Sequence, residues 1–334
     1  MSLSLTSSCP TCLKTDKLLR CQGCKVMFYC SKEHQTADRS AHKTACNAVK
    51  KAGIKCNAEE TKLRNHPGDF MTPANPFENA VGRFWGILDT RDYMRSKYGV
   101  VEALLKIKTR VAVQEALTHV LDILRLNRSD NMGVRSAAPA LFLRLGKDQE
   151  CYDFIKWWAT CDPDGTYDWG DMTLPYLSTK DADPLESEDI FSDAYGDLSI
   201  TSSVVLIKLR LLMEVKSLQN STLLRSKIPS ELVKDIQDGI AGPILARYKN
   251  IMSSAEQRSV VIKNLESQVD KLYKDIAKMN PHFWPAVVNP GAHLTARPEY
   301  SSRGTKEEMQ ISLQQCYDAW AETPGAIDFI REKL

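Results

Sequence analysis

Residues 9–46 have the sequence CPTCLKTDKLLRCQGCKVMFYCSKEHQTADRSAHKTAC, and the cysteines and histidines in it determine how the N-terminal region folds. It holds six cysteines and two histidines at the spacing of metal ligands: Cys9, Cys12, Cys21, Cys24, Cys30, His34, His42 and Cys46. The two CxxC pairs predict metal-binding turns, and the last four ligands form two pairs spaced i, i+4, so each pair can share one face of a helix. Structural zinc takes four thiolate or imidazole ligands in a tetrahedron. Eight ligands therefore predict two Zn²⁺ ions.

Disulfide bonds are the alternative use of so many cysteines. Disulfide-dense small domains are typical of secreted chains, and residues 1–8 lack the charged and apolar regions of a signal peptide. Zinc is therefore the prediction. The remaining cysteines have no ligand spacing and are expected to be reduced, and either buried or incidental: Cys56, Cys151, Cys161 and Cys316.

The ligand order C-x2-C-x8-C-x2-C-x5-C-x3-H-x7-H-x3-C resembles that of a MYND zinc finger, and the segment 28–32 (FYCSK) strengthens the likeness. The resemblance implies interleaved sites: Cys9, Cys12, Cys30 and His34 for the first zinc, and Cys21, Cys24, His42 and Cys46 for the second. It also implies a shallow groove for proline-containing peptides, with Gln35 at the position of a groove glutamine. The chain departs from the family at His34, which is usually Cys. It departs again at Arg39, where a groove Trp is common, so Gln35 and Arg39 are the candidate partner-binding residues.

Zinc explains how so short a segment could fold. About 40 residues bury too little apolar surface to fold unaided, whereas a structural zinc contributes on the order of 10 kcal/mol or more of folding free energy. Protein ligands fill all four positions of each predicted site, so no position is open for an activated water. The finger is predicted to be a scaffold and recognition surface, not a hydrolytic centre.

Composition limits the remaining possibilities. A chain of 334 residues with 43% hydrophobic content predicts two or three domains with a sizeable core. The net charge is only +2, but residues 1–66 carry 12 Lys/Arg against 5 Asp/Glu, which could face phosphate or an acidic partner or form a solvated surface. The longest apolar stretch, 203–213, is interrupted by Lys208 and Arg210, so no membrane span is expected. Unpaired cysteines without an export signal predict a cytoplasmic or nuclear location.

The predicted organisation is a finger at 1–50, a polar linker at 51–75 and a mainly α-helical body at 76–334. Apolar periodicity predicts helices over 77–97, 110–126, 132–145, 148–157, 203–219, 230–250, 254–279, 305–321 and 324–333. Pro139 predicts a kink or a helix start near Ser136. Gly146 is expected just after a helix end, and Asp148 is expected to cap the next helix. Residues 280–300, rich in proline and aromatic residues, are expected to be irregular.

Residues 125–158 resemble the helical hairpins of tetratricopeptide-like proteins, in which an Asp-Asn-x-Gly-x-Arg turn opens the second helix. The matching residues here are Asp130, Asn131, Gly133 and Arg135. Asp130 is expected to accept helix N–H bonds, Gly133 to let a neighbouring helix approach, and Arg135 to pair with an acid on that helix. No repeat of fixed period is present. The whole layout resembles fungal MYND-finger proteins with a helical body, a group that implies no reaction.

Other features have two interpretations each. Apolar residues spaced 3-4-3-4-3 over 262–279 indicate a coiled-coil seam or, as the short run favours, a helix packed on its neighbour. The aspartates at 162–171 do not fit the EF-hand pattern, which favours a solvated loop. The acidic run 181–197 would be a mobile inter-helix loop or a surface for a basic partner. His119 is expected to be a helix-packing residue.

The function these features favour is a zinc-binding adaptor for a protein or peptide partner, without catalysis. MYND fingers also occur in SET-domain lysine methyltransferases, which makes such an enzyme the alternative. It would need an Asn-His-Ser-Cys-like knot, whereas Asn65-His66 is followed by Pro67-Gly68. A second alternative is a nucleic-acid-associated regulator that uses the basic finger, although the base-reading zinc-finger spacing is absent. Common nucleotide-binding and hydrolase motifs are absent too.

Overall fold

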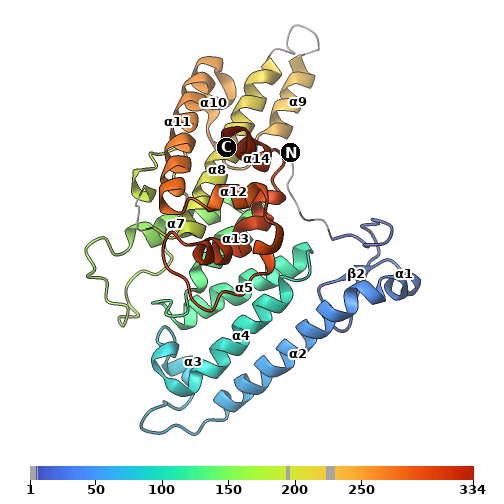
Figure 1. Cartoon of the computed structure of the whole chain (residues 1–334), viewed down its shortest axis with the longest axis vertical. Helices are drawn as coiled ribbons and strands as arrows, with labels where there is room; N and C mark the ends of the chain where they lie inside the picture. The colour runs from blue at the N-terminus through green and yellow to red at the C-terminus, as the bar shows by residue number, and fades with distance from the viewer. Residues whose placement is uncertain (1–4, 6, 193–195, 223–229) are drawn as a thin grey trace. The chain divides into compact units, whose positions relative to one another are not determined.

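A computed structural model describes residues 5, 7–192, 196–222 and 230–334, and the chain divides into two compact units (Figure 1). The finger unit comprises Ser4–Leu145 and Thr166–Tyr176, and the C-terminal unit contains Gly146–Gly165 and Leu177–Leu334. The finger and the first body helices therefore belong to one unit. A finger followed by a mainly helical body is confirmed.

The elements of the finger unit are, in chain order, β1 (Leu19–Arg20), β2 (Phe28–Tyr29), α1 (Lys32–Ala37), α2 (Arg39–Arg64), α3 (Pro76–Asn79), η1 (Phe84–Gly86), η2 (Leu88–Thr90), α4 (Arg91–Leu104), α5 (Arg110–Leu126), η3 (Val134–Ala137) and α6 (Ala138–Arg144). The two strands form an antiparallel pair with Leu19 opposite Tyr29. Helix α2 lies along α4, α4 packs on α5, and α5 packs on α6 (Figure 1).

The elements of the C-terminal unit are α7 (Asp148–Thr160), η4 (Asp189–Phe191), α8 (Leu198–Ser221), α9 (Ser230–Ile240), η6 (Leu245–Arg247), α10 (Lys249–Ser253), α11 (Ala255–Met279), α12 (Phe283–Val288), η7 (Gly291–Thr295), α13 (Lys306–Ala321) and α14 (Ala326–Lys333). Segment 280–300, expected to be irregular, thus contains α12 and η7. Described α-helices range from 4 to 26 residues, and the tetratricopeptide likeness stays a prediction.

The linker expected from residue 51 is helical through Arg64, as part of the 26-residue helix α2. The segment is polar, which suggested a linker, but Val49, Cys56 and Leu63 recur every seven residues and are buried. They place one narrow side of α2 against α4. A stripe this narrow is enough to hold a helix on a neighbour while the rest of its surface stays polar.

The single helix expected over 77–97 is wrong. The chain instead forms α3, η1 and η2 before α4 begins at Arg91. Gly82 breaks the helix with a φ of +87°, and a Cβ there would lie 2.0 Å from the Met172 sulfur. Aromatic rings of this stretch nevertheless cluster: Phe77 lies 5.2 Å from Phe84 and 5.1 Å from Tyr93 between ring centroids.

In the turn before α6, Asp130 caps the helix as expected, but Gly133 has a different role from the one predicted. Asp130 accepts hydrogen bonds from the N–H groups of Val134 (2.9 Å) and Arg135 (3.0 Å), as predicted. A Cβ on Gly133 would meet nothing within 4 Å, but this residue has a φ of +69°, so backbone conformation and not close helix approach requires glycine. The Arg135 guanidinium lies 3.9 Å from Asp130 in the same turn.

The boundary between α6 and α7 confirms one prediction and corrects another. Gly146 follows α6 with a φ of +70°, the conformation favoured just after a helix end. Asp148 is not the N-cap of α7, because that position is Lys147, which makes no side-chain cap. Asp148 instead pairs with Arg210 at 2.7 Å. Pro139 lies in the first turn of α6, where it is tolerated.

The core of the C-terminal unit is organised around α8. Leu265, Val269, Leu272 and Ile276 of α11 are buried, and α11 packs against α8. The interpretation of 262–279 as a helix packed on its neighbour is therefore confirmed. Among the described helices, none offers the length of apolar sequence that a membrane span requires.

Two charged side chains of α8 lie inside this core. Lys208 is 0% exposed, and its ammonium donates to the carbonyls of Pro184 (3.2 Å) and Glu186 (2.9 Å) and to the Gln268 side-chain oxygen (2.8 Å). Arg210 is 4% exposed and, besides Asp148, donates to the Thr323 hydroxyl at 2.7 Å. Burial lowers the pKa of Lys208 to about 8, against the raising effect of nearby carboxylates. Both cations are hydrogen-bonded, which is the usual condition for burying a charge.

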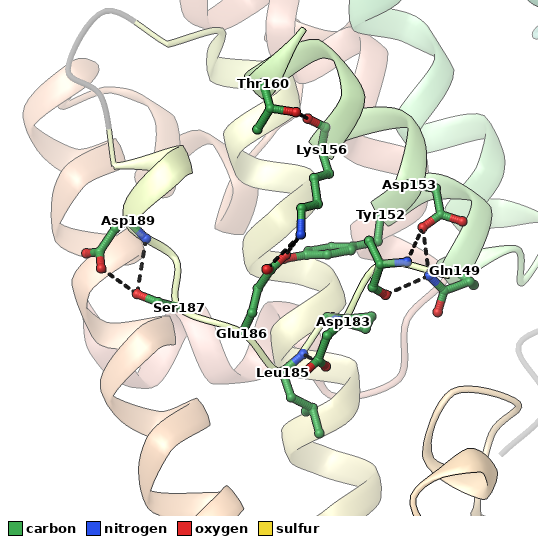
Figure 2. A network of polar contacts seen from close by, with 12 residues as sticks. Gln149, Tyr152, Asp153, Lys156, Thr160, Asp183, Leu185, Glu186, Ser187 and Asp189 are labelled. Carbon is green, nitrogen blue, oxygen red and sulfur yellow. Dashed lines mark hydrogen bonds and ion pairs between the residues drawn. The ribbon is translucent and has the colours of Figure 1, made fainter. Parts of the chain in front are cut away.

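The described part of the acidic run 181–197, expected to be a mobile loop, is held by side chains of α7 along its length (Figure 2). Glu186 accepts from Lys156 and from the Tyr152 hydroxyl, each at 2.7 Å. Asp153 accepts from the backbone N–H groups of Asp181 and Ala182 at 3.0 and 2.9 Å. Glu186 therefore serves the fold. Asp193 of this run lies outside the described residues.

We expect the stability of the C-terminal unit to fall as pH rises from about 5 to 8 because of Glu214. Burial raises the pKa of this α8 carboxyl from 4.5 to about 7, against the lowering effect of the Gly242 N–H, which donates to it at 3.2 Å. Between these two pKa values the folded chain holds a proton that the unfolded chain has released, so the free energy of unfolding falls by up to about 3 kcal/mol. Urea denaturation across this pH range measures it. Glu214→Gln should flatten this part of the profile, and identical profiles for the two proteins would contradict the assignment.

Candidate metal centre

The first ligand set gathers residues from two turns and the start of α1. Cys9, Cys12, Cys30 and His34 place one ligand atom each within 4.8 Å of one another. The Cys12 and Cys30 sulfurs are 3.5 Å apart, and His34 Nδ1 lies 3.5 Å from the Cys9 sulfur. Ser31 caps α1 by accepting from the His34 N–H at 3.3 Å, which fixes the helix turn that brings His34 back to Cys30.

The second set is made by the other CxxC turn and the first part of α2. Cys21, Cys24, His42 and Cys46 are all buried, and their ligand atoms also lie within 4.8 Å of one another. The sulfurs of Cys21 and Cys46 are 3.7 Å apart, and His42 Nε2 lies 3.5 Å from the Cys24 sulfur. Because His42 and Cys46 are one helical turn apart, α2 itself supplies half of this site.

Both sets fit zinc. With Zn–S bonds of about 2.3 Å and Zn–N bonds of about 2.0 Å, the ligand atoms of a tetrahedron lie roughly 3.5–3.8 Å apart. The separations of 3.5–3.7 Å given above match this spacing. Each set has three cysteines and one histidine, one of the combinations that structural zinc uses. The chain therefore holds two zinc sites with every coordination position supplied by protein.

The two CxxC turns share one backbone geometry. Leu13 and Lys25, each directly after the second cysteine, both have a φ of +62°. Their N–H groups donate to the carbonyls of Cys9 and Cys21 at 2.8 and 2.9 Å. In the second turn a Cβ on Gly23 would lie 2.7 Å from the Cys46 sulfur, so glycine leaves room for the ligand from α2.

Backbone dipoles prepare the first cysteine of each turn for metal. Burial raises the pKa of Cys9 and of Cys21, but hydrogen bonds from backbone N–H groups and from the His34 or His42 side chain outweigh it and bring both to about 6. The pKa of Cys30 is raised to about 11, chiefly by its hydrogen bond with Cys12, and burial raises that of Cys46 to about 11. Bound zinc would favour the thiolate at all of these positions, so its binding releases protons.

Contacts around the second site tie the finger to the body helices of its unit. The buried Tyr29 ring meets the His42 ring edge-on, with centroids 6.1 Å apart, and its hydroxyl donates to Asp38 at 2.7 Å. The Val26 carbonyl, two residues after Cys24, accepts from the buried Thr109 hydroxyl at 2.7 Å. Thr109 is also the N-cap of α5. The finger therefore rests on the start of α5 and does not swing on a linker.

The comparison with protein families agrees with this geometry. The model of the MYND finger matches residues 9–46. Residues 9–46 are a MYND finger. Two curated proteins, Egl nine homolog 1 of Homo sapiens and of Mus musculus, are each 50% identical to this chain over 38 residues, which is 11% of the chain. The chain covers 9% and 10% of these two relatives, about a tenth of their length. No solved structure matches the chain.

The departures of this MYND finger from the family are visible in the structure. His34 takes the place of the usual cysteine and keeps its place in the ligand set, because its Nδ1 lies 3.5 Å from the Cys9 sulfur. Arg39 is exposed at the first position of α2. Gln35 is half-buried on α1. The two candidate partner-binding residues are thus separated by less than two helical turns of chain across the α1–α2 junction.

A third cluster was not predicted from the sequence. His66 Nε2 lies 3.7 Å from Asp69 and 3.8 Å from Asp89. His66 Nδ1 accepts a hydrogen bond from the Gly68 N–H at 3.1 Å, so the neutral ring carries its proton on Nε2 and cannot offer that atom to a metal. The cluster closes the turn after α2. The sequence could not predict this cluster, because one histidine and two separated aspartates do not follow the spacing of metal ligands.

The remaining candidate residues have no metal role in the described structure. Cys56, Cys151 and Cys316 are buried and Cys161 is half-buried, and none forms a disulfide. Within the described ranges, the aspartates of the loop at 162–171 belong to no cluster that could hold a metal ion. His119 is half-buried in α5, and burial lowers its pKa, which agrees with a packing role.

Proposed function

We propose that this protein is a zinc-dependent adaptor that binds a protein partner through its MYND finger and has no catalytic activity of its own. The observation that carries the proposal is the closed coordination of both sites, where three cysteines and one histidine leave no position for water or substrate. Zinc then shapes a recognition surface. A reducing compartment, the cytoplasm or the nucleus, belongs to the same proposal because none of the ten cysteines forms a disulfide.

In this proposal the partner surface would lie at the junction of α1 and α2, around Gln35 and Arg39. By the family resemblance, Gln35 would contact a short proline-containing peptide. Arg39 replaces an apolar groove wall with an exposed cation, so the preferred peptide would carry an acidic residue opposite it. The contact between Thr109 and Val26 holds this surface in fixed relation to α5. A partner bound there would be held against the helical part of the finger unit, as an adaptor requires.

The methyltransferase alternative gains no support from the described residues. Asn65 and His66 lie at the end of α2 and in the turn that follows it. The strands among residues 5, 7–192, 196–222 and 230–334 are the two-residue β1 and β2, whereas a SET domain is rich in strands. Binding of S-adenosylmethionine to the purified protein would revive this alternative.

Partner capture from native extract tests the proposal with three forms of the full chain. Gln35→Ala keeps all eight ligands and should lose the partner set while retaining two zinc ions. Cys12→Ser should lose the first zinc and the same partners. Gln314→Ala, on α13 of the C-terminal unit, is the control and should retain both.

Two results would overturn the proposal. If all three variants capture the same partners as the unchanged protein, the finger is not the recognition surface. If an activity towards a small substrate or a lysine side chain accompanies the purified protein and disappears with a single substitution in the body, the non-catalytic role is wrong.

A further inference from the structure

The outward face of α2 is a long cationic surface. From Arg39 to Ala58 the helix has no aspartate or glutamate. The same stretch carries five cations, all exposed: Arg39, Lys43, Lys50, Lys51 and Lys55. In the part of the chain that the structure describes, the four lysines make no ion pair, in contrast to Lys62, which lies 3.7 Å from Glu59.

Such a surface opposes helix stability. Arg39 and Lys43 are four residues apart, as are Lys51 and Lys55, and like charges at this spacing destabilise a helix. Solvated helix faces normally alternate the two signs and gain from i, i+4 pairs. Solubility alone therefore does not explain twenty residues without an acidic side chain. Binding of an anionic partner would explain them.

The cations lie in two rows with an uncharged floor between them. At about 100° per residue, Arg39, Lys43 and Lys50 fall within about 40° of one another, and Lys51 and Lys55 form a second row about 120° away. Three residues spaced by seven lie between the rows: Ser40, Asn47 and Ile54. The Ile54 side chain is 61% exposed. The opposite side of the helix holds Val49 and Cys56, which are buried.

We propose that α2 binds duplex DNA by entering its major groove. The groove is wide enough to admit one α-helix, and phosphates border it on both sides, where the two rows of cations would lie. The floor residues match what base edges offer, since an Asn side chain pairs with adenine and an apolar group contacts the thymine methyl. This partner lies beyond the protein partner proposed above, and the two surfaces share only Arg39 at the start of the helix.

Two other anionic partners fit the surface less well. An acidic protein segment would place its charges along the middle of the face, where this helix has an uncharged floor. The major groove of duplex RNA is too deep and narrow for side chains to read. The observations therefore favour DNA over both.

The test measures binding of the zinc-loaded full chain to a mixed-sequence DNA duplex of about 20 base pairs, with the same RNA duplex and poly-L-glutamate as comparison probes. With five cations at phosphates, affinity should fall about 500-fold between 50 and 200 mM salt. Lys43→Gln/Lys50→Gln should reduce that fall to about 40-fold, because two phosphate contacts are lost. Lys51→Gln/Lys55→Gln, on the other row, should do the same.

The control is Lys263→Gln/Lys274→Gln, which removes two exposed lysines of α11 and the same net charge. It should leave the salt dependence unchanged, and zinc content shows that each variant is folded. The proposal fails if poly-L-glutamate or RNA binds as tightly as DNA, if only one row of lysines matters, if the control has the same effect, or if no probe binds.

Discussion

Replacing Cys24 by serine is expected to release the second zinc and to unfold the first half of α2 together with the finger. A structural zinc contributes on the order of 10 kcal/mol of folding free energy, which is comparable to the roughly 5–15 kcal/mol total stability of a domain. The effect reaches α2 because His42 and Cys46, two ligands of the same ion, belong to this helix. Losing their metal leaves the acid-free stretch of lysines without the interaction that holds it helical.

Cys12→Ser is the matched comparison. It also removes one thiolate, but from the first site, whose ligands lie in the N-terminal turn and at α1. We expect it to lose one zinc and to loosen the turn and α1 while α2 stays protected. Metal analysis gives the zinc content, and amide hydrogen exchange gives the protection of residues 42–56.

A third substitution, Cys161→Ser, removes a thiol that belongs to neither ligand set and should change neither measurement. If Cys24→Ser retained two zinc ions, the assignment of the second site would be wrong. If it lost one ion but left α2 as protected as before, packing on α4 would be sufficient to hold the helix.

Lys208→Met is expected to give the largest loss of stability in the C-terminal unit, about 2–4 kcal/mol. Methionine keeps the length and apolar stem of the side chain but leaves the carbonyls of Pro184 and Glu186 without their donor. The Gln268 side-chain oxygen loses its donor as well. Because Lys208 is 0% exposed, water cannot replace these bonds without opening the packing between α8 and α11.

Lys216→Met on the same helix is the control. Lys216 pairs with Glu266 at 2.7 Å, but its side chain is 45% exposed and that of its partner 47%. An exposed pair of this kind contributes less than about 1 kcal/mol. Chemical denaturation compares the two variants, and proteolysis within 184–189 reports release of the acidic run. Equal midpoints for Lys208→Met and the unchanged protein would show that the buried ammonium gains nothing over an apolar side chain.

The local sequence was sufficient for the zinc ligands and for several helices. Two ligands can reach the same metal ion when they are three residues apart in a turn or four apart on a helix. The spacing of Cys9/Cys12 and of His42/Cys46 therefore shows, without the fold, that each pair can bind one ion. Helix α11 was predictable for a similar reason. Ser254 caps it by accepting from the Gln257 N–H at 3.2 Å, and its apolar period runs to the end of the helix. Caps and periodicity depend on neighbours in the chain.

Features that depend on partners distant in the chain could not be predicted from the local sequence. Residues 51–64 have the polar composition of a linker, yet α4 provides the surface on which Cys56 and Leu63 are buried. The helix expected over 77–97 is interrupted at Gly82, which Met172 of a distant loop approaches. Charged side chains such as Lys208 and Arg210 are not expected in a core. They are buried because segments 22 to 113 residues away in the chain supply their hydrogen-bond acceptors. A sequence specifies which groups need partners, whereas the fold determines which segments supply them.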